Sequence, residues 1–253
     1  MKKILGLVFA ILLVAGIVYA KCTGYYCGAA SSGGSSFCTT CSGNLTFCWE
    51  ITANDLTITN SGGCSAGDTT GTAASQATLS AAPSGRTGYA IEVGATDAGG
   101  YDNIAFDTAS IFNDESGTIQ LDFYIPSDGG FVAGTRLFGC EPQASQDRVE
   151  VVLAGTDEIR LLHEGANGGN DFVATTSANI ATDTWYTVIA KWRTGETTPY
   201  LSISCNGDTQ TYTSSQLTAF DTAESILGFG NLGSGIHGYA FIKNIKLWNA
   251  WQD

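Results

Sequence analysis

Two motifs have the residue types and spacing of catalytic or metal sites. Cys38 and Cys41 show the C-x-x-C spacing that zinc knuckles and redox sites use. Gly63–Gly67 matches the G-x-S-x-G pattern of hydrolases that use a nucleophilic serine. That motif requires a buried strand before it and a helix after it, whereas here it falls in a loop rich in Gly, Ser and Thr. The sequence therefore gives no support to a serine nucleophile.

The cysteines favour disulfide bonds over metal binding. Six of the eight fall in one stretch and two follow much later: Cys22, Cys27, Cys38, Cys41, Cys48, Cys64, Cys140 and Cys205. An even number in an exported chain indicates bridges, although spacing cannot choose among the alternative pairings. Residues 21–48 are expected to form a small disulfide-stapled segment, because their Gly/Ser-rich interior cannot build a core.

Export is predicted from the start of the chain. The basic pair Lys2-Lys3 precedes an apolar run, Ile4–Ala20, and Val18-Tyr19-Ala20 puts small residues where a signal peptidase cleaves. The alternative is an uncleaved anchor, but the run is at the lower length limit for a membrane span. We expect residues 1–20 to be a signal peptide. The mature protein would then be secreted or lie at the cell surface, with no membrane insertion after cleavage.

The composition excludes several classes of function. The chain has 24 acidic and 11 basic side chains, which give a formal charge of −13. Binding to nucleic acid or to anionic lipid is disfavoured, because both require a basic surface. A hydrophobic content of 43% with only 14% charged residues indicates a folded domain instead of a disordered chain. Of the two histidines, His163 ends an expected strand and is interpreted as a surface hairpin residue instead of a ligand or base.

Alternation of apolar and polar residues predicts strands throughout the chain beyond the leader. The expected strands are 89–93, 118–125, 148–153, 158–163, 184–193, 200–205, 209–213, 225–230 and 239–248. Turn residues separate them, and Asn206-Gly207 is the strongest turn dipeptide. Short strands at this spacing predict an all-β antiparallel two-sheet sandwich over residues 49–253.

Five segments resemble, in the same order, strands of the laminin-G-like and concanavalin A-like jelly rolls. They are 117–126, 184–192, 200–207, 226–230 and 238–248. The resemblance implies a jelly roll of two antiparallel sheets, with Trp185, Trp192 and Trp248 at core positions. Lectins, adhesion modules, glycanases and polysaccharide lyases all use this fold, so the fold alone does not give the function.

The resemblance also allows a test for enzymatic chemistry. The glycanases of this superfamily carry E-x-D-x-x-E on one strand, where alternation puts the catalytic carboxylates on one face. No glutamate in this chain is followed two residues later by aspartate. The lyases use a Gln-x-His strand, and Leu161-Leu162-His163 lacks the glutamine. A non-catalytic domain is favoured. The alternatives are a polysaccharide-degrading enzyme with a divergent site and a structural protein of a matrix or envelope.

A calcium site is the one metal centre that the resemblance implies. Related domains often hold a structural Ca²⁺ between an early acidic loop and the last strand. The segment from Asp97 to Asn103 lies where that loop would fall, with Asp102 as the first expected ligand and Asp97 as the second. Short Asp/Asn/Gly loops supply the oxygens that calcium needs, but they are also ordinary turns. Lys243-Asn244 stands where the family has an acidic residue, which weakens the expectation.

The expected ligand face is a polar stripe on the strands. Its candidate residues are Asp122, Tyr124, Glu150, Arg160, Lys191 and Arg193. They alternate with apolar residues and are expected to come from neighbouring strands, with Tyr124 and Arg160 marking the binding face. The alternative is a set of cross-strand ion pairs on a solvated sheet. The sequence thus predicts a secreted, lectin-like or adhesion module whose partner is a glycan or another extracellular surface component.

Overall fold

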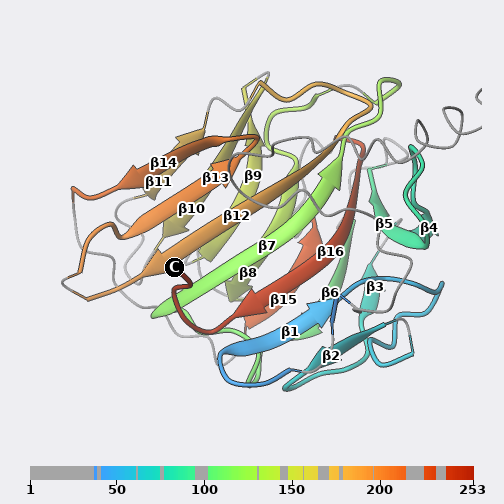
Figure 1. The fold of residues 1–253 in the computed structure, drawn as a ribbon, viewed down its shortest axis with the longest axis horizontal. Coiled ribbons are helices and arrows are strands. Elements are labelled where there is room, and N and C mark those ends of the chain that lie inside the picture. The colour runs from blue at the N-terminus through green and yellow to red at the C-terminus, as the bar shows by residue number, and fades with distance from the viewer. Residues whose placement is uncertain are drawn as a thin grey trace, which may run out of the picture. The chain divides into compact units, whose positions relative to one another are not determined.

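The computed structural model confirms the all-β prediction. It describes residues 37–38, 41–60, 62–74, 77–94, 102–129, 131–142, 148–155, 157–164, 171–176, 179–195, 197–214, 225–231 and 238–253. Within these ranges the chain forms sixteen strands and no helix. The strands make two antiparallel sheets that pack as a sandwich (Figure 1). The expected signal peptide lies outside the described residues, and no helix within them is long and apolar enough to cross a membrane.

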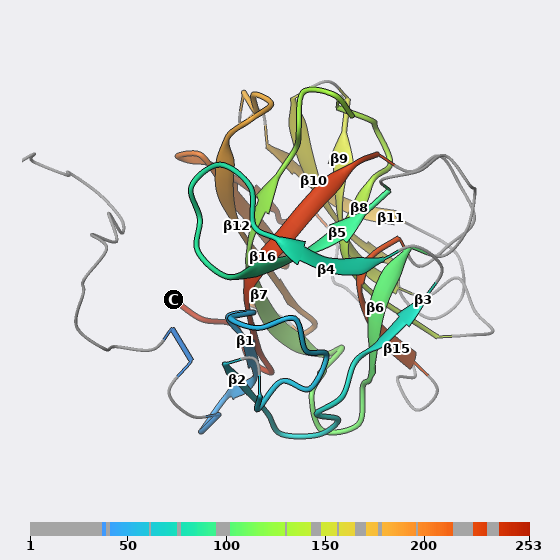
Figure 2. The ribbon, with the colours of Figure 1, turned by 90° about the vertical axis from the view of Figure 1, so that its right-hand side faces the viewer.

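The first sheet has nine strands. Seven of them follow in the order β14 (Asp208–Tyr212), β13 (Leu201–Cys205), β12 (Trp185–Arg193), β7 (Ser116–Tyr124), β16 (Ala240–Trp248), β1 (Leu45–Trp49) and β2 (Gly63–Ser65). The other two are β5 (Tyr89–Val93), which pairs with β16, and β4 (Thr78–Ala81), which pairs with β5. The connection between β4 and β5 extends beside β16 and β12 (Figure 2).

The second sheet has seven strands. Their order is β11 (Asp171–Thr176), β10 (Glu158–Glu164), β9 (Arg148–Ala154), β8 (Arg136–Pro142), β15 (Ser225–Gly230), β6 (Asn103–Asp107) and β3 (Thr72–Ala74). The expected hairpin of β9 and β10 is present, and its strands pair from Glu158 opposite Ala154 to Glu164 opposite Arg148. At the expected turn after β13, Asn206 and Gly207 have φ angles of 48° and 83°, in keeping with a tight hairpin turn.

The core between the sheets follows from the alternation of each strand. On β7 the side chains of Ile119, Leu121 and Phe123 are fully buried, as predicted. Of the three tryptophans expected in the core, Trp192 is fully buried, but Trp185 packs in a separate cluster on the outer face of the first sheet. Trp248 is only half-buried. The face to which β7 presents Asp122 and Tyr124 is also covered, because both residues are at most 7% exposed.

Two disulfides attach the cysteine-rich segment to the first sheet. Cys38 is bonded to Cys48 in β1, and Cys41 is bonded to Cys64 in β2. Because β1 begins at Leu45, the last residues of the segment expected at 21–48 contribute a strand to the sandwich. Burial raises the pKa of the free Cys205 thiol to about 12, so this core cysteine stays protonated at neutral pH.

His163 is not a surface residue, which corrects the prediction from sequence. Its side chain is 0% exposed, and it shares the inward face of β10 with Ile159 and Leu161. Burial lowers the pKa of the imidazole to about 4, although a hydrogen bond with the Asp114 backbone partly opposes the shift. The alternation of β10 already indicated burial, since His163 follows the inward-facing Leu161 by two residues.

This burial predicts a dependence of stability on pH. The folded-state pKa lies below the unfolded value of 6.5, so the unfolded state binds the proton more readily. The contribution of His163 is complete above pH 6.5 and is lost as the pH falls toward 4, by up to about 3 kcal/mol. Urea titrations at several pH values measure the free energy of unfolding. Between pH 6.5 and 4, this free energy should fall less for His163→Gln than for the wild-type protein. An identical loss in both proteins would contradict the buried neutral imidazole.

Candidate functional site

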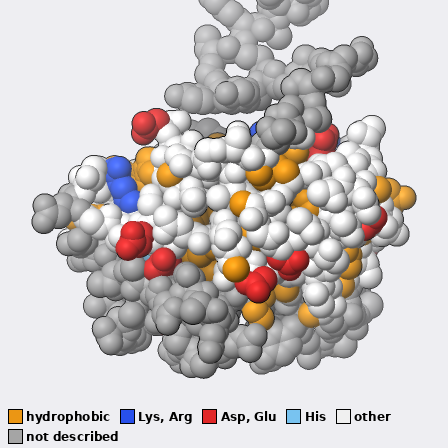
Figure 3. Space-filling view, turned by 90° about the horizontal axis from the view of Figure 1, so that it is seen from below, with side chains coloured by type: hydrophobic (Ala, Val, Ile, Leu, Met, Phe, Trp, Pro, Cys, Tyr) orange, Lys and Arg blue, Asp and Glu red, His pale blue; other side chains and the backbone are white. Residues whose placement is uncertain are grey.

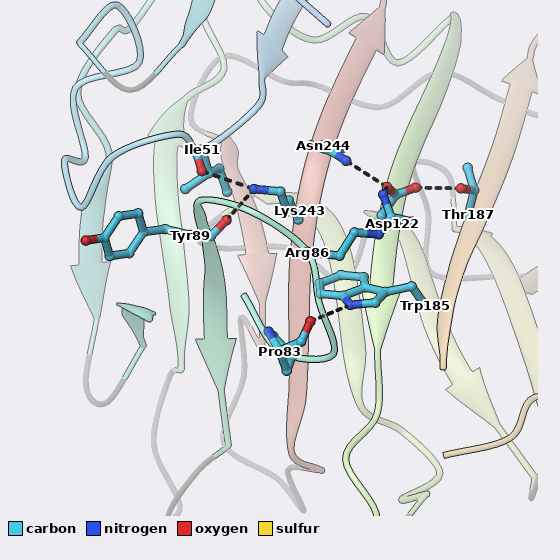
Figure 4. A network of polar contacts seen from close by, with 9 residues as sticks. All are labelled: Ile51, Pro83, Arg86, Tyr89, Asp122, Trp185, Thr187, Lys243 and Asn244. Atoms are coloured by element: carbon cyan, nitrogen blue, oxygen red, sulfur yellow. Dashed lines mark hydrogen bonds and ion pairs between the residues drawn. The ribbon is translucent and has the colours of Figure 1, made fainter. Parts of the chain in front are cut away.

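A cavity of about 360 Å³ opens where two connections of the first sheet meet the strand β16. Its lining comes from the segment after β1, the β4–β5 connection and the middle of β16: Glu50, Thr52, Arg86, Thr87, Gly88, Lys243 and Asn244. We call this cavity the hairpin pocket. Figure 4 shows its surroundings, where the β4–β5 connection crosses in front of β16.

A bulge in β16 supplies two neighbouring residues to the pocket. The pairing of β16 with β7 shifts between Lys243 and Lys246, and Asn244 has a φ of 52°. In a regular strand, successive side chains point to opposite faces, so only one of Lys243 and Asn244 would reach the pocket. A bulge re-aims side chains in this way, and here it lets both residues line the same cavity.

Lys243 forms a buried positive charge beside the pocket. Its side chain is 5% exposed, and the Nζ atom donates hydrogen bonds to the carbonyl oxygens of Ile51 (3.2 Å) and Tyr89 (2.9 Å). Burial lowers the pKa of this ammonium, while the Glu50 carboxylate favours the charged form. Gly88 leaves room for it, because a Cβ there would lie 3.0 Å from Nζ at a φ of +81°. The ammonium is therefore fixed by backbone carbonyl groups of the neighbouring segments.

Asp122 joins the pocket to β12. Its carboxylate accepts hydrogen bonds from Thr187 Oγ1 (2.5 Å) and Asn244 Nδ2 (2.8 Å). The Arg86 Nη1 atom lies 3.5 Å from Asp122 Oδ2 in an ion pair. Figure 4 shows these three contacts meeting at one carboxylate. Asp122 thus fixes Asn244 and holds Arg86 against the sheet.

An aromatic cluster adjoins this network on the outer face of the first sheet. It consists of Tyr124, Trp185, Tyr239 and Phe241. The Trp185 ring lies 5.4 Å from the Tyr124 ring, and its Nε1 donates to the Pro83 carbonyl at 3.0 Å. The Arg86 guanidinium lies over Trp185, 5.5 Å from the ring centroid. Arg86 therefore contacts both the aromatic cluster and Asp122.

Carboxylates surround the two tyrosines of the cluster. Tyr124 Oη donates to Asp183 at 3.0 Å, and Tyr239 Oη donates to Glu92 at 2.8 Å. Burial, followed by these hydrogen bonds and by nearby carboxylates that include Asp128, raises the pKa of both phenols. Both tyrosines consequently remain protonated donors at neutral pH.

Several polar groups of the hairpin pocket form no hydrogen bond or ion pair with the described part of the chain. Among the described residues, nothing forms a hydrogen bond or ion pair with the half-buried Glu50 carboxylate or with the exposed hydroxyls of Thr52 and Thr87. The Arg86 side chain keeps 43% of its surface exposed. The pocket thus presents one carboxylate, two hydroxyls and a guanidinium that can bond to a ligand.

The expected polar stripe is wrong in one respect, because its residues lie on two different sheets. Asp122 and Tyr124 are on β7, whereas Glu150 and Arg160 are on β9 and β10 of the second sheet. Because Tyr124 lies on the first sheet and the exposed Arg160 lies on the second, the proposed pair does not form one face. The strand pattern showed which side chains alternate, but not which sheet each strand joins.

Glu150 belongs to a chain of charges on the second sheet. It forms ion pairs with Arg136 and with Arg148, the latter at 3.2 Å. Arg148 also contacts Glu164 at 3.2 Å. This arrangement matches the alternative that the sequence left open, a set of cross-strand ion pairs.

Lys191 and Arg193 lie at the opposite end of β12 from the pocket. In the pairing with β7 they stand across from Thr118 and Ser116. Lys191 Nζ donates to the Gln252 carbonyl, and the Arg193 guanidinium stacks 4.3 Å from the centroid of the Trp251 ring. These two cations therefore attach the end of the chain to the outer face of the first sheet.

The calcium expectation remains a prediction. Asp102 is fully buried beside β6, and its backbone carbonyl accepts a hydrogen bond from Asn231 N at 2.8 Å. Asp97 lies outside the described residues. Within the described part of the chain, no group of three or more His, Cys, Asp or Glu side chains is placed to hold a metal ion.

Sequence reasoning missed most of the hairpin pocket. Glu50, Thr52, Arg86 and Thr87 come from two connections that no motif links. One available signal was the turn sequence Pro83-Ser84-Gly85, where Ser84 and Gly85 both have positive φ angles. That signal predicts a tight turn, but not the surface against which the turn packs.

Comparisons with known proteins support the fold. No protein-family model matches the chain, and no curated protein matches it in sequence. The botulinum neurotoxin serotype D binding domain is 10% identical over 83% of this chain and 49% of that one, with a TM-score of 0.57. The binding domain of Paraclostridial Mosquitocidal Protein 1 is 10% identical over 83% and 50%, with a TM-score of 0.56.

A shorter structure matches over nearly its full length. It is domain 4 of AbnA, a GH43 extracellular arabinanase from Geobacillus stearothermophilus, in complex with arabinotriose. It is 14% identical over 82% of this chain and 93% of that one, with a TM-score of 0.57. Our chain spans about half the length of the toxin binding domains. At these identities the likeness shows the fold alone.

Proposed function

We propose that this protein is a secreted glycan-binding module and that the hairpin pocket holds the sugar. The observation that carries the proposal is a set of pocket-wall groups, from Glu50, Thr52 and Thr87, that form no hydrogen bond or ion pair with the described residues. Sugars offer hydroxyls that both donate and accept, so they suit a wall that mixes a carboxylate with hydroxyl and guanidinium donors. Arg86 provides the guanidinium, and the Asn244 amide is already oriented by Asp122.

The fold comparison supports this choice. The arabinanase domain that shares the fold is in complex with arabinotriose, and the other two structures are binding domains by name. Two disulfides agree with an exported protein. A glycan or another extracellular surface component is accordingly the proposed partner, and calcium remains the proposed cofactor.

The test is a glycan array with residues 21–253, run with calcium and again with EGTA, followed by titration of arabinotriose and of the best array ligand. Binding that disappears in EGTA supports calcium dependence. Binding that survives EGTA excludes it. If no glycan binds under either condition, the proposal is wrong, and a structural protein becomes the better account. Turnover of a bound polysaccharide would instead show an enzyme.

Blocking the pocket should abolish binding without unfolding the domain. Thr87 is exposed at the pocket, so Thr87→Trp fills the cavity with a bulky ring. We expect the affinity of the array ligand to fall at least tenfold, or about 1.4 kcal/mol, because the ligand loses several hydrogen bonds. Thr211→Trp, at an exposed position of the edge strand β14, is the matched control. Equal affinities in the two variants would place the site elsewhere.

A further inference from the structure

The side chain of Arg86 occupies a position that it holds only weakly. It is 43% exposed, and its polar and ring contacts with the described residues are the 3.5 Å ion pair with Asp122 and the 5.5 Å approach to Trp185. The ion pair is long, and the guanidinium stands near the outer limit of a cation–π contact, so each contact contributes little to stability. The backbone that carries Arg86 is fixed more firmly, since Ala82 N donates to Gly88 O at 3.1 Å. The side chain can therefore leave while the connection stays in place.

The position that Arg86 would vacate has the chemistry of a cation site. One wall is the face of the Trp185 indole, and the other is the Asp122 carboxylate, which is 91% buried and already oriented by Thr187 and Asn244. An aromatic face beside a buried carboxylate attracts a positive group far more than a neutral one. The guanidinium of Arg86 is thus an internal ligand of this site.

The surrounding charges favour the same kind of ligand. Glu50 lines the adjoining pocket, and Glu92, Asp128 and Asp183 stand around the aromatic cluster. Two lysines are also near, but both are engaged. The Lys243 ammonium is bound to two backbone carbonyls, and the Lys246 ammonium, which interacts with Glu50, lies over the Phe37 ring. On the face drawn in Figure 3, acidic side chains are scattered among hydrophobic and other uncharged groups, in keeping with the charge of −13.

We infer that Trp185 and Asp122 form a subsite for a protonated amine and that an amino sugar displaces Arg86 to reach it. The inference rests on the proposed function, because it adds this subsite to the hairpin pocket. The ring of the sugar would stack on Trp185, its ammonium would pair with Asp122, and its neighbouring unit would lie in the pocket. The ligand class is then a glycan with free amino groups instead of N-acetylated ones.

The probes are a trisaccharide of glucosamine and its fully N-acetylated counterpart, titrated by calorimetry into the mature chain. We expect the amine-bearing trisaccharide to bind at least about fivefold more tightly at low salt, and the preference to shrink as salt screens the charge pair. Arg86→Ala should strengthen binding of the amine-bearing probe by about threefold to thirtyfold, because the internal competitor is gone. The same variant should not strengthen binding of the N-acetylated probe, because that probe loses the hydrogen-bond donor that Arg86 provides.

The two trisaccharides should respond differently to Arg86→Ala, and this difference tests the inference. Equal affinities for the two trisaccharides, or weaker binding of the amine-bearing probe to Arg86→Ala, would overturn the inference. Arg86→Lys, which keeps a cation but loses the planar group, should fall between wild type and Arg86→Ala. If the array finds a neutral glycan while neither trisaccharide binds, the proposed function stands and the amine subsite does not exist.

Discussion

Replacement of Trp192 by alanine should lower the free energy of unfolding by about 4 kcal/mol, the typical cost of deleting a large core side chain. Trp192 is fully buried, and its ring stacks with that of Phe112 at 5.3 Å and with that of Phe138 at 6.3 Å. Phe138 belongs to the opposite sheet, so the deletion removes a contact that joins the two layers. It also leaves the Asn113 carbonyl without the donor that Trp192 Nε1 provides at 2.9 Å.

Urea denaturation followed by circular dichroism measures this loss without relying on tryptophan fluorescence. Trp251→Ala is the matched control, because that ring is half-exposed and stacks only on the outer face of the first sheet. The control should cost about 1 kcal/mol or less. If both variants lost the same stability, Trp192 would not be the ring that joins the two sheets.

Removal of the two disulfides should have the largest effect of all. The bridges close loops with sequence separations of 10 and 23 residues, and each loop closure is worth about 3 kcal/mol in the unfolded-state model. The bridges join Cys38 and Cys41 to β1 and β2, at one edge of the first sheet. The variant with serine at all four bridge positions should therefore unfold at that edge first.

Hydrogen exchange of β1 and β2 amides, together with the thermal midpoint, checks this order. Cys205→Ala is the control, since it removes a buried thiol that forms no bridge. We expect the control to lose about 1 kcal/mol and to keep β1 and β2 protected. Uniform loss of protection across both sheets in the bridge variant would contradict a local role for the disulfides.

Alternation along the chain predicted the strands and their inward faces, but not what covers their outward faces. For β7 it gave the correct inward residues, Ile119, Leu121 and Phe123, because one face of the strand is uniformly apolar. It also predicted that Asp122 and Tyr124 would be accessible, and they are buried. Alternation separates the two faces of a strand, but it cannot show that a distant hairpin, here the β4–β5 connection, packs over the second face.

The candidate site was harder to predict for a related reason. The hairpin of β9 and β10 pairs neighbours in sequence, so its register followed from the turn between them. The pairing of β7 with β12 and β16 joins segments far apart along the chain, and no local pattern specifies it. The contacts of Asp122 with Arg86, Thr187 and Asn244 depend on that pairing, and so does the hairpin pocket.

The location of the glycan site is the central claim, and amide chemical shifts measured by NMR test it most directly. During titration with the best ligand from the array, the largest shifts should fall at Glu50–Thr52, Arg86–Gly88 and Lys243–Asn244, around the hairpin pocket. Shifts concentrated instead on β9 and β10, around Glu150 and Arg160, would contradict this account and would place the ligand on the second sheet.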